Sequence, residues 1–248
     1  MPVNAVLFRF RFWVLAAIFI MGFVAPWDRW LALDGREKTW LALAEWLWRN
    51  GWLGLNAATI AVLLAGIVSA IAAAGLRTWA TAYLGGNVVQ SKRLLAGSEV
   101  VADGPYRYLR NPLYLGVWLH ALALAVLMPP GGAAFAIVAT AAFVLALIRG
   151  EESFLIGKLG APYAEYKKLV PPLVPALAPR VKPRGLTPRW PQAVTAEVYM
   201  WGVALSFGVL GWRYNAHLLT KCVLVSLGVS LVARAFSFEN RPQPAPDG

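Results

Sequence analysis

The chain has 248 residues, of which 59% are hydrophobic and only 14% are charged. A soluble domain carries about 25% charged residues, so these charges are too few to cover a soluble globule of this length. The net charge of +11 would suit nucleic acid, but the basic residues lie in short stretches between apolar runs. Cytoplasmic loops in contact with anionic lipids have that pattern. The composition therefore predicts an all-α, polytopic integral membrane protein and argues against nucleic-acid binding.

Six apolar segments approach the length of about 20 residues that a spanning helix needs. They are residues 10–27, 52–76, 113–128, 132–148, 194–211 and 215–236. The first has no small-residue cleavage site, so we expect a retained span and no cleaved signal peptide. The third and fourth are short and are separated by Met-Pro-Pro-Gly-Gly at 128–132, which predicts a helical hairpin.

Charge along the chain favours one orientation of these segments. Most of the 23 Lys and Arg residues fall in stretches that share a side of the membrane with the N-terminus. Because cytoplasmic loops are rich in Lys and Arg, we expect both termini to be cytoplasmic. If the source is bacterial, the membrane is the inner one.

The segments between the spans complete the domain organisation. In the stretch 29–50, Trp40 and Trp48 could lie on one face of a helix, but we favour an outer loop lying flat on the membrane. The predicted parts are two N-terminal spans with this interfacial loop (1–76), a core with two polar segments (77–175), a basic Pro-rich linker (176–193), two C-terminal spans (194–236) and a disordered tail (237–248).

A first polar motif precedes the predicted hairpin. Residues 103–116 read Asp-Gly-Pro-Tyr-Arg-Tyr-Leu-Arg-Asn-Pro-Leu-Tyr-Leu-Gly. Pro112 suits the first turn of a helix, and Asn111 before it is a predicted N-cap. Free backbone N–H groups at that helix start, beside Arg107 and Arg110, would attract a carboxylate or another anion.

A second polar motif follows the hairpin directly. Residues 149–166 read Arg-Gly-Glu-Glu-Ser-Phe-Leu-Ile-Gly-Lys-Leu-Gly-Ala-Pro-Tyr-Ala-Glu-Tyr. Ionisable groups at a membrane boundary are costly unless they are paired or functional. Glu151 and Glu152 are adjacent, so on a helix they point about 100° apart. One could face a ligand while the other pairs with an arginine.

Together the two motifs resemble the isoprenylcysteine carboxyl methyltransferase family, to which the phospholipid N-methyltransferases are related. The resemblance rests on Gly-Pro-Tyr-Arg-x-x-Arg-Asn-Pro-x-Tyr-x-Gly, the hairpin, Arg-x-Glu-Glu-x-x-Leu and Gly-x-x-Tyr-x-x-Tyr, in that order. Arg77-Thr78-Trp79-Ala80 with Leu84-Gly85 fits the pattern before them. The match covers about 77–175, and it is specific because several short motifs occur in order.

The resemblance implies an S-adenosyl-L-methionine-dependent methyltransferase with a cofactor pocket at the cytoplasmic face. A lipid-like or prenyl-linked acceptor would enter from the bilayer. The implied cofactor-binding residues are Gly104, Tyr106, Arg110, Asn111, Pro112, Tyr114, Gly116, Glu151 and Glu152. The implied catalytic residues are Arg149, Glu151 and Glu152, with Arg149 orienting a substrate carboxylate. Eukaryotic isoprenylcysteine enzymes have His where this chain has Asn111, which removes a titratable group.

Three other functions remain open from the sequence. A phospholipid N-methyltransferase would need a base for its amine acceptor, and Glu151 or Glu152 could supply one. A membrane reductase like the sterol reductases would bind NADPH, but its second motif is typically rich in Arg and Asp and is followed by Cys. A non-catalytic membrane protein such as a transporter should have polar residues deep in several spans.

The sequence predicts no metal site and fixes no oligomeric state. Its two histidines and one cysteine, Cys222, are too far apart in the chain to form a common zinc site. The expected partners are membrane lipids and the small lipid-like or prenyl-linked methyl acceptor. An oligomer is compatible with the sequence but not indicated by it.

Overall fold

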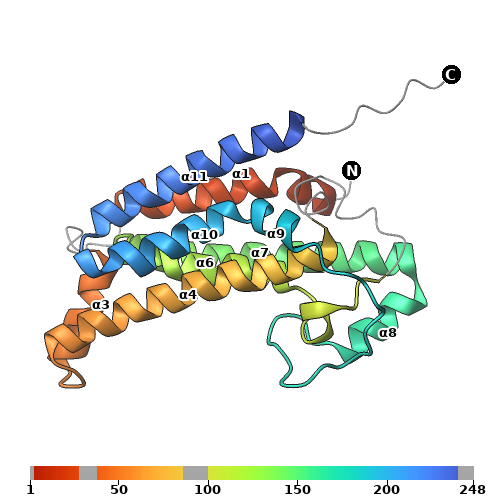
Figure 1. Ribbon diagram of the computed structural model, residues 1–248. Helices are drawn as coiled ribbons and strands as arrows, with labels where there is room; N and C mark the ends of the chain where they lie inside the picture. Colours follow the sequence, from red (N-terminus) through yellow and green to blue (C-terminus); the bar gives the residue numbers. More distant parts are fainter. Residues whose placement is uncertain (1–2, 28–37, 86–99, 240–248) are drawn as a thin grey trace.

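The computed structural model describes residues 3–27, 38–85 and 100–239. Every regular element in these ranges is helical, which confirms the all-α prediction (Figure 1). The α-helices are α1 (Val3–Val24), α3 (Thr39–Arg49), α4 (Leu55–Leu84), α6 (Pro112–Ala125), α7 (Pro130–Leu159), α8 (Ala161–Leu169), α9 (Trp190–Ala196), α10 (Val198–Leu205) and α11 (Ala216–Glu239). Three short pieces are η2 (Gly104–Arg107), η3 (Ser206–Leu210) and η4 (Gly211–Arg213).

Length and apolar composition decide which helices could cross a membrane. Within the described residues, α4, α7 and the first 18 residues of α11 meet both criteria. The segment from α9 to η4 meets them as a span that is bent by 68°. Helix α6 is apolar, but its 14 residues extend only about 21 Å, less than the hydrocarbon core of about 30 Å. All six predicted segments are helical, whereas the count of six membrane crossings remains a prediction.

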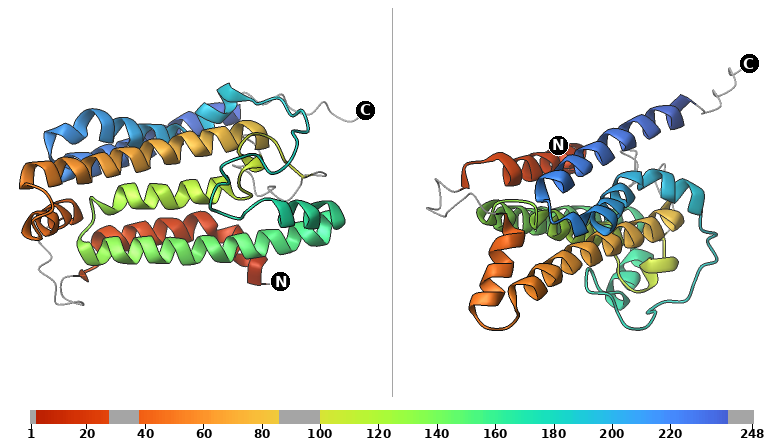
Figure 2. Two further views of the ribbon diagram at one scale, coloured as in Figure 1. Left: turned by 90° about the horizontal axis from the view of Figure 1, so that it is seen from below. Right: turned by 60° about the vertical axis from the view of Figure 1, so that its left-hand side comes forward.

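The core lies where α4, α6 and the first half of α7 meet the C-terminal helices. Leu63 of α4, Leu124 of α6 and Phe207 of η3 are fully buried there. Helix α1 runs alongside α7 (Figure 2), and the two backbones touch at a pair of glycines. A Cβ on Gly132 would lie 1.9 Å from the carbonyl oxygen of Gly22, so only glycine permits this crossing.

Residues 39–49 form a helix, so the interpretation of this stretch as a loop was wrong. The backbone N–H groups of Thr39 and Trp40 donate to the carbonyls of Met128 (2.8 Å) and Val126 (3.0 Å) at the hairpin turn. The indole N–H of Trp40 donates to the carbonyl of Thr59 on α4 (3.0 Å). These bonds supply partners for free groups at two helix ends, which makes the helix preferable to a loop. Residues 28–37 of the predicted interfacial loop lie outside the described residues.

An irregular Pro-rich segment, residues 170–189, runs along the first motif (Figure 1). Proline has no N–H but keeps its carbonyl as an acceptor. The backbone N–H groups of Arg110 and Asn111 donate to the carbonyls of Pro171 (2.8 Å) and Pro172 (3.2 Å). Further along, the N–H of Arg180 donates to the carbonyl of Arg107 (2.8 Å). We call residues 170–189 the strap.

The C-terminal boundary differs slightly from its prediction. Helix α11 continues to Glu239, past residue 237, where the disordered tail was expected to begin. The rest of that predicted tail, 240–248, lies outside the described residues.

The glycine contact between α1 and α7 gives a test of the fold. We expect Gly132→Ala to lower the thermal unfolding temperature in detergent by several degrees, because its Cβ would collide with the α1 backbone. Gly157→Ala in the same helix is the matched control, because no atom lies within 4 Å of its added Cβ. The control should unfold at the same temperature or higher, since Ala favours a helix over Gly. Equal behaviour of the two variants would contradict the crossing.

Candidate active site

Glu152 of α7 is the centre of a buried polar cluster, with 5% of its surface exposed. Its carboxylate accepts from Nε of Arg110 at 2.8 Å and from Nδ2 of Asn111 at 3.3 Å. Nζ of Lys167 on α8 lies 3.0 Å from its other oxygen. A buried carboxylate is tolerated when it is paired and hydrogen-bonded in this way. The cluster therefore ties the first motif, the second motif and α8 together.

Arg110 joins the strap to this cluster. Its Nη1 donates to the carbonyl of Lys167 at 2.6 Å and also to the carbonyl of Val170. Asn111 is the N-cap residue of α6, as predicted, but its side chain makes no cap hydrogen bond. Its amide donates instead to Glu152 and to the carbonyl of Pro172 (3.1 Å). Pro112 does begin α6, as its fixed φ predicts.

Glu151 points away from this cluster, as the 100° rotation per residue predicts. Its Oε2 accepts a hydrogen bond from the hydroxyl of Tyr114 on α6 at 2.8 Å. That bond is the only one that the described residues make to the Glu151 carboxylate. Among the described residues, both oxygens of Glu152 have partners, whereas Oε1 of Glu151 has none.

Tyr106 of η2 adds a second polar group that lacks a partner among the described residues. Its side chain is 8% exposed, and its hydroxyl has no hydrogen-bond partner among the residues that the structure describes. Burial, and then the negative charge of Glu151, raise the pKa of Tyr106 well above its ordinary value, so the hydroxyl keeps its proton. The hydroxyl of Tyr166 on α8 fixes the Tyr106 backbone by donating to its carbonyl at 2.8 Å. The hydroxyl of Tyr106 is therefore a neutral hydrogen-bond donor in a fixed position, without an acceptor among the described residues.

The two glycines predicted to line the pocket, Gly104 and Gly116, lie against other side chains at positions where a Cβ would collide. Gly104 has a φ of +55°, and a Cβ there would lie 2.4 Å from the ring of Tyr83. A Cβ on Gly116 would lie 2.3 Å from Cγ of Arg77. Gly116 therefore lets the Arg77 side chain pass across α6. Both glycines shape the motif backbone.

Arg149 stands apart from the other predicted site residues. Its side chain is exposed on α7. Within residues 3–27, 38–85 and 100–239, no hydrogen bond or ion pair connects Arg149 to Glu151, Glu152 or Tyr114. Its role in orienting a substrate carboxylate remains a prediction without structural support.

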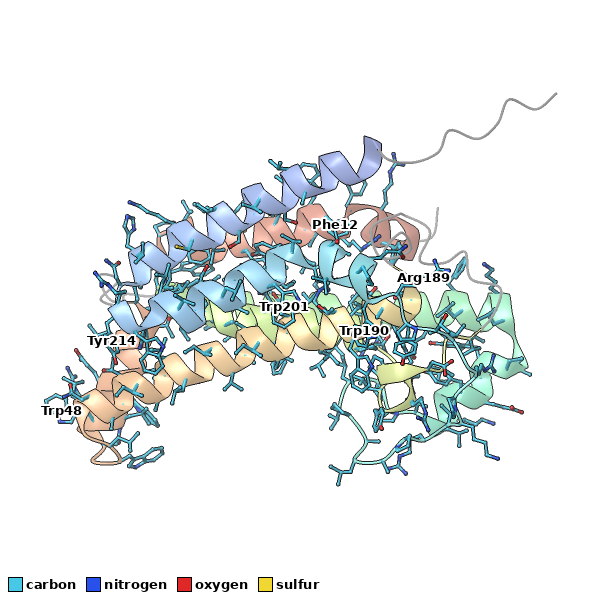
Figure 3. All side chains as sticks on the ribbon, viewed as in Figure 1. Phe12, Trp48, Arg189, Trp190, Trp201 and Tyr214 are labelled. Atoms are coloured by element: carbon cyan, nitrogen blue, oxygen red, sulfur yellow. The ribbon has the colours of Figure 1, made fainter. Side chains whose placement is uncertain are left out.

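A buried ion pair between α4 and the C-terminal helices was not among the residues predicted from the sequence. Glu197, at the bend between α9 and α10, is 2% exposed and accepts from Nε (2.7 Å) and Nη2 (2.9 Å) of Arg77. The hydroxyl of Thr81 donates to the same carboxylate at 3.0 Å. Figure 3 shows Trp201 of α10 beside α4, where its indole donates to Thr78 (2.9 Å). A lone acid in an apolar segment was the available signal for Glu197.

With the geometry described, the chain can be compared with known proteins. A model of the Isoprenylcysteine carboxyl methyltransferase (ICMT) family matches residues 63–157, which hold most of α4, all of α6 and nearly all of α7. The family resemblance that the motifs predicted is therefore confirmed over this stretch. The adjacent carboxylates Glu151 and Glu152 lie inside it.

Two curated relatives match parts of the chain. Methanethiol S-methyltransferase 2 of Bradyrhizobium diazoefficiens is 40% identical over 75 residues, which are 30% of this chain and 28% of that protein. Protein-S-isoprenylcysteine O-methyltransferase of Schizosaccharomyces pombe is 35% identical over 99 residues, which are 36% of this chain and 39% of that protein. The chain thus spans about a third of the length of these relatives. No solved structure is significantly similar to it.

The ion pair between Arg77 and Glu197 predicts a large stability effect. We expect Glu197→Ala to destabilise the protein by about 3–5 kcal/mol, because it leaves the Arg77 guanidinium buried without its counter-charge. Glu165→Ala is the matched control, since Glu165 is an exposed acid on α8, and it should be nearly neutral. The double variant Arg77→Met with Glu197→Gln should recover part of the loss. Chemical denaturation in micelles measures all three, and a neutral Glu197→Ala would contradict the assignment.

Proposed function

We propose that the protein is an S-adenosyl-L-methionine-dependent methyltransferase that acts on a lipid-like acceptor at the membrane, most closely resembling an isoprenylcysteine carboxyl O-methyltransferase. The observation that carries this proposal is the Tyr114–Glu151 hydrogen bond beside the saturated Glu152 cluster. It brings the two motifs that the family match covers into one polar site at the end of an apolar hairpin.

The side chains around Glu151 suit the polar groups of this cofactor. S-adenosyl-L-methionine carries an ammonium, ribose hydroxyls and a positive sulfonium, and when bound it supplies the methyl group. The free oxygen of Glu151 can accept from an ammonium or a hydroxyl, and the unpartnered hydroxyl of Tyr106 can donate. Buried polar atoms without partners are uncommon in folded proteins, so a polar ligand gives them a function.

The residues divide into ligand contacts and supports. We assign ligand contact to Glu151, Tyr106 and Tyr114. We assign Arg110, Asn111 and Glu152 to positioning, because their polar atoms already bond one another and the strap. Such a framework fixes the site before any ligand binds, and pre-organisation of that kind lowers the entropic cost of aligning reactants.

The chemical class of the methyl acceptor can be inferred from how few side chains at the site could act as a general base. A carboxylate attacks a methyl group without losing a proton, so the enzyme needs mainly alignment and exclusion of water. A thiol or an amine must first be deprotonated, and Asn111 cannot serve as a base. This favours O-methylation of a carboxylate. Methylation of a phospholipid amine is the second candidate, and Glu151 would then be the base.

We further propose the membrane arrangement of the site. The exposed basic residues of α8 and the strap lie on segments that bond to the polar cluster, which supports a cytoplasmic position for the site and for both termini. In a bacterial cell the membrane would be the inner one. The α6–α7 hairpin would enter the bilayer from that side, so that a water-soluble cofactor and a lipid-soluble acceptor meet at its polar end.

Glu151→Gln tests this function. We expect the variant to fold and to lose about tenfold to a hundredfold in affinity for S-adenosylhomocysteine, because it removes a charge-assisted contact. Isothermal titration calorimetry measures the affinity, and transfer of labelled methyl to membrane extracts measures the activity. Glu165→Gln on α8 is the control and should match the wild type. Wild-type protein that binds NADPH in place of S-adenosylhomocysteine would contradict the proposal.

A further inference from the structure

A buried arginine on α1 lies outside the stretch that matches the family. Arg11 is 5% exposed, and its Nη1 donates to the carbonyl of Phe8 at 3.0 Å. Its guanidinium lies 4.1 Å from the ring centre of Phe8 and 4.6 Å from that of Phe12, which Figure 3 labels. These contacts hold the side chain in place. Its Nη2 is buried and has no hydrogen-bond partner in the part of the chain that the structure describes.

This guanidinium lies at the level of the candidate site. Phe19 of α1 packs against His120 of α6, with ring centres 5.9 Å apart, and the two helices run in the same direction (Figure 2). Arg11 lies about two helical turns before Phe19, and Tyr114 lies nearly two turns before His120, so Arg11 and Tyr114 are at about the same height along the helices. Arg11 nevertheless forms no ion pair with Glu151 among the described residues. The Arg11 guanidinium and the Glu151 carboxylate thus lie in the same region. Among the described residues, Nη2 of Arg11 and Oε1 of Glu151 have no hydrogen-bond partner.

The neighbouring Arg9 shows what an ordinary membrane-surface arginine does on the same helix. Its side chain is exposed, as expected of a basic residue that anchors a span at the cytoplasmic surface. Arg11 is buried instead, and a guanidinium cannot lose its charge to relieve burial. Anchoring therefore explains Arg9 but leaves the free Nη2 of Arg11 without a function.

We propose that Arg11 binds the carboxylate of a ligand in the Glu151–Tyr114 site. This inference rests on the proposed function. Guanidinium groups are well matched to carboxylates, and the bond is strong where water is excluded. Two ligands could supply this carboxylate. One is the cofactor, through its amino-acid end, whose ammonium would face Glu151. The other is a methyl acceptor that is itself a carboxylate.

The first experiment tests the cofactor as the source. Calorimetry compares S-adenosylhomocysteine with its decarboxylated analogue on wild type, Arg11→Gln, Arg11→Lys and the control Arg9→Gln. If the cofactor supplies the carboxylate, the wild type should bind the decarboxylated analogue about tenfold more weakly. Arg11→Gln should bind both compounds alike, Arg11→Lys should retain part of the preference, and Arg9→Gln should match the wild type.

The second experiment tests the acceptor as the source. It compares an S-prenylcysteine with its carboxamide on the same four proteins in the presence of S-adenosylhomocysteine. If the acceptor supplies the carboxylate, only the Arg11 variants lose the preference for the acid, while their affinity for S-adenosylhomocysteine stays at the wild-type value.

The inference is overturned if the wild type prefers neither carboxylate compound, or if folded Arg11→Gln keeps the wild-type preference in both experiments. The first outcome is measured on the wild type alone, so the inference can be overturned even if Arg11→Gln does not fold. Failure of the proposed function looks different, since the wild type would then bind no S-adenosylhomocysteine at all. Binding of that ligand with no role for Arg11 would leave the proposed function in place.

Discussion

A single buried carboxylate, that of Glu152, sets the arrangement of the polar end of the α6–α7 hairpin. Its negative charge lies at the end of an apolar helix, where an unpaired ion would be very costly. The partners come from the start of α6 and from α8, and Arg110 extends the network into the strap. The hairpin, α8 and the strap therefore have to fold together, because each supplies a group that bonds within this cluster.

The adjacent carboxylate of Glu151 takes no part in this cluster, so it remains available to a ligand. Since successive helical residues point about 100° apart, fixing Glu152 on one side turns Glu151 toward Tyr114 on another. The C-terminal helices support the same region from outside the family-matched stretch. Glu197 holds Arg77 of α4, and the Arg77 side chain crosses Gly116 and donates to the carbonyl of Leu113 at 3.3 Å. The C-terminal helices thus stabilise the start of α6, which carries Tyr114.

The sequence predicted those features that depend on local signals. Apolar segment lengths located the helices, Pro-Pro-Gly-Gly located the hairpin turn, and Pro112 located the start of α6. Features that depend on distant partners were missed. Asn111 is a donor to Glu152, and residues 39–49 are helical because their N–H groups meet the hairpin turn. Arg11 and Glu197 stand out in the sequence as charges within apolar segments, but nothing local shows what each one faces.

The account depends on where the cofactor binds, so the most direct measurement is an experimental structure of the protein with S-adenosylhomocysteine. We predict that the ligand contacts Glu151 and the hydroxyl of Tyr106, at the junction of α6, α7 and η2, while the Arg110–Glu152 pair stays intact. Ligand bound elsewhere, or bound with Glu152 released from Arg110 to make the contact, would contradict the division of the two carboxylates into one that binds and one that positions.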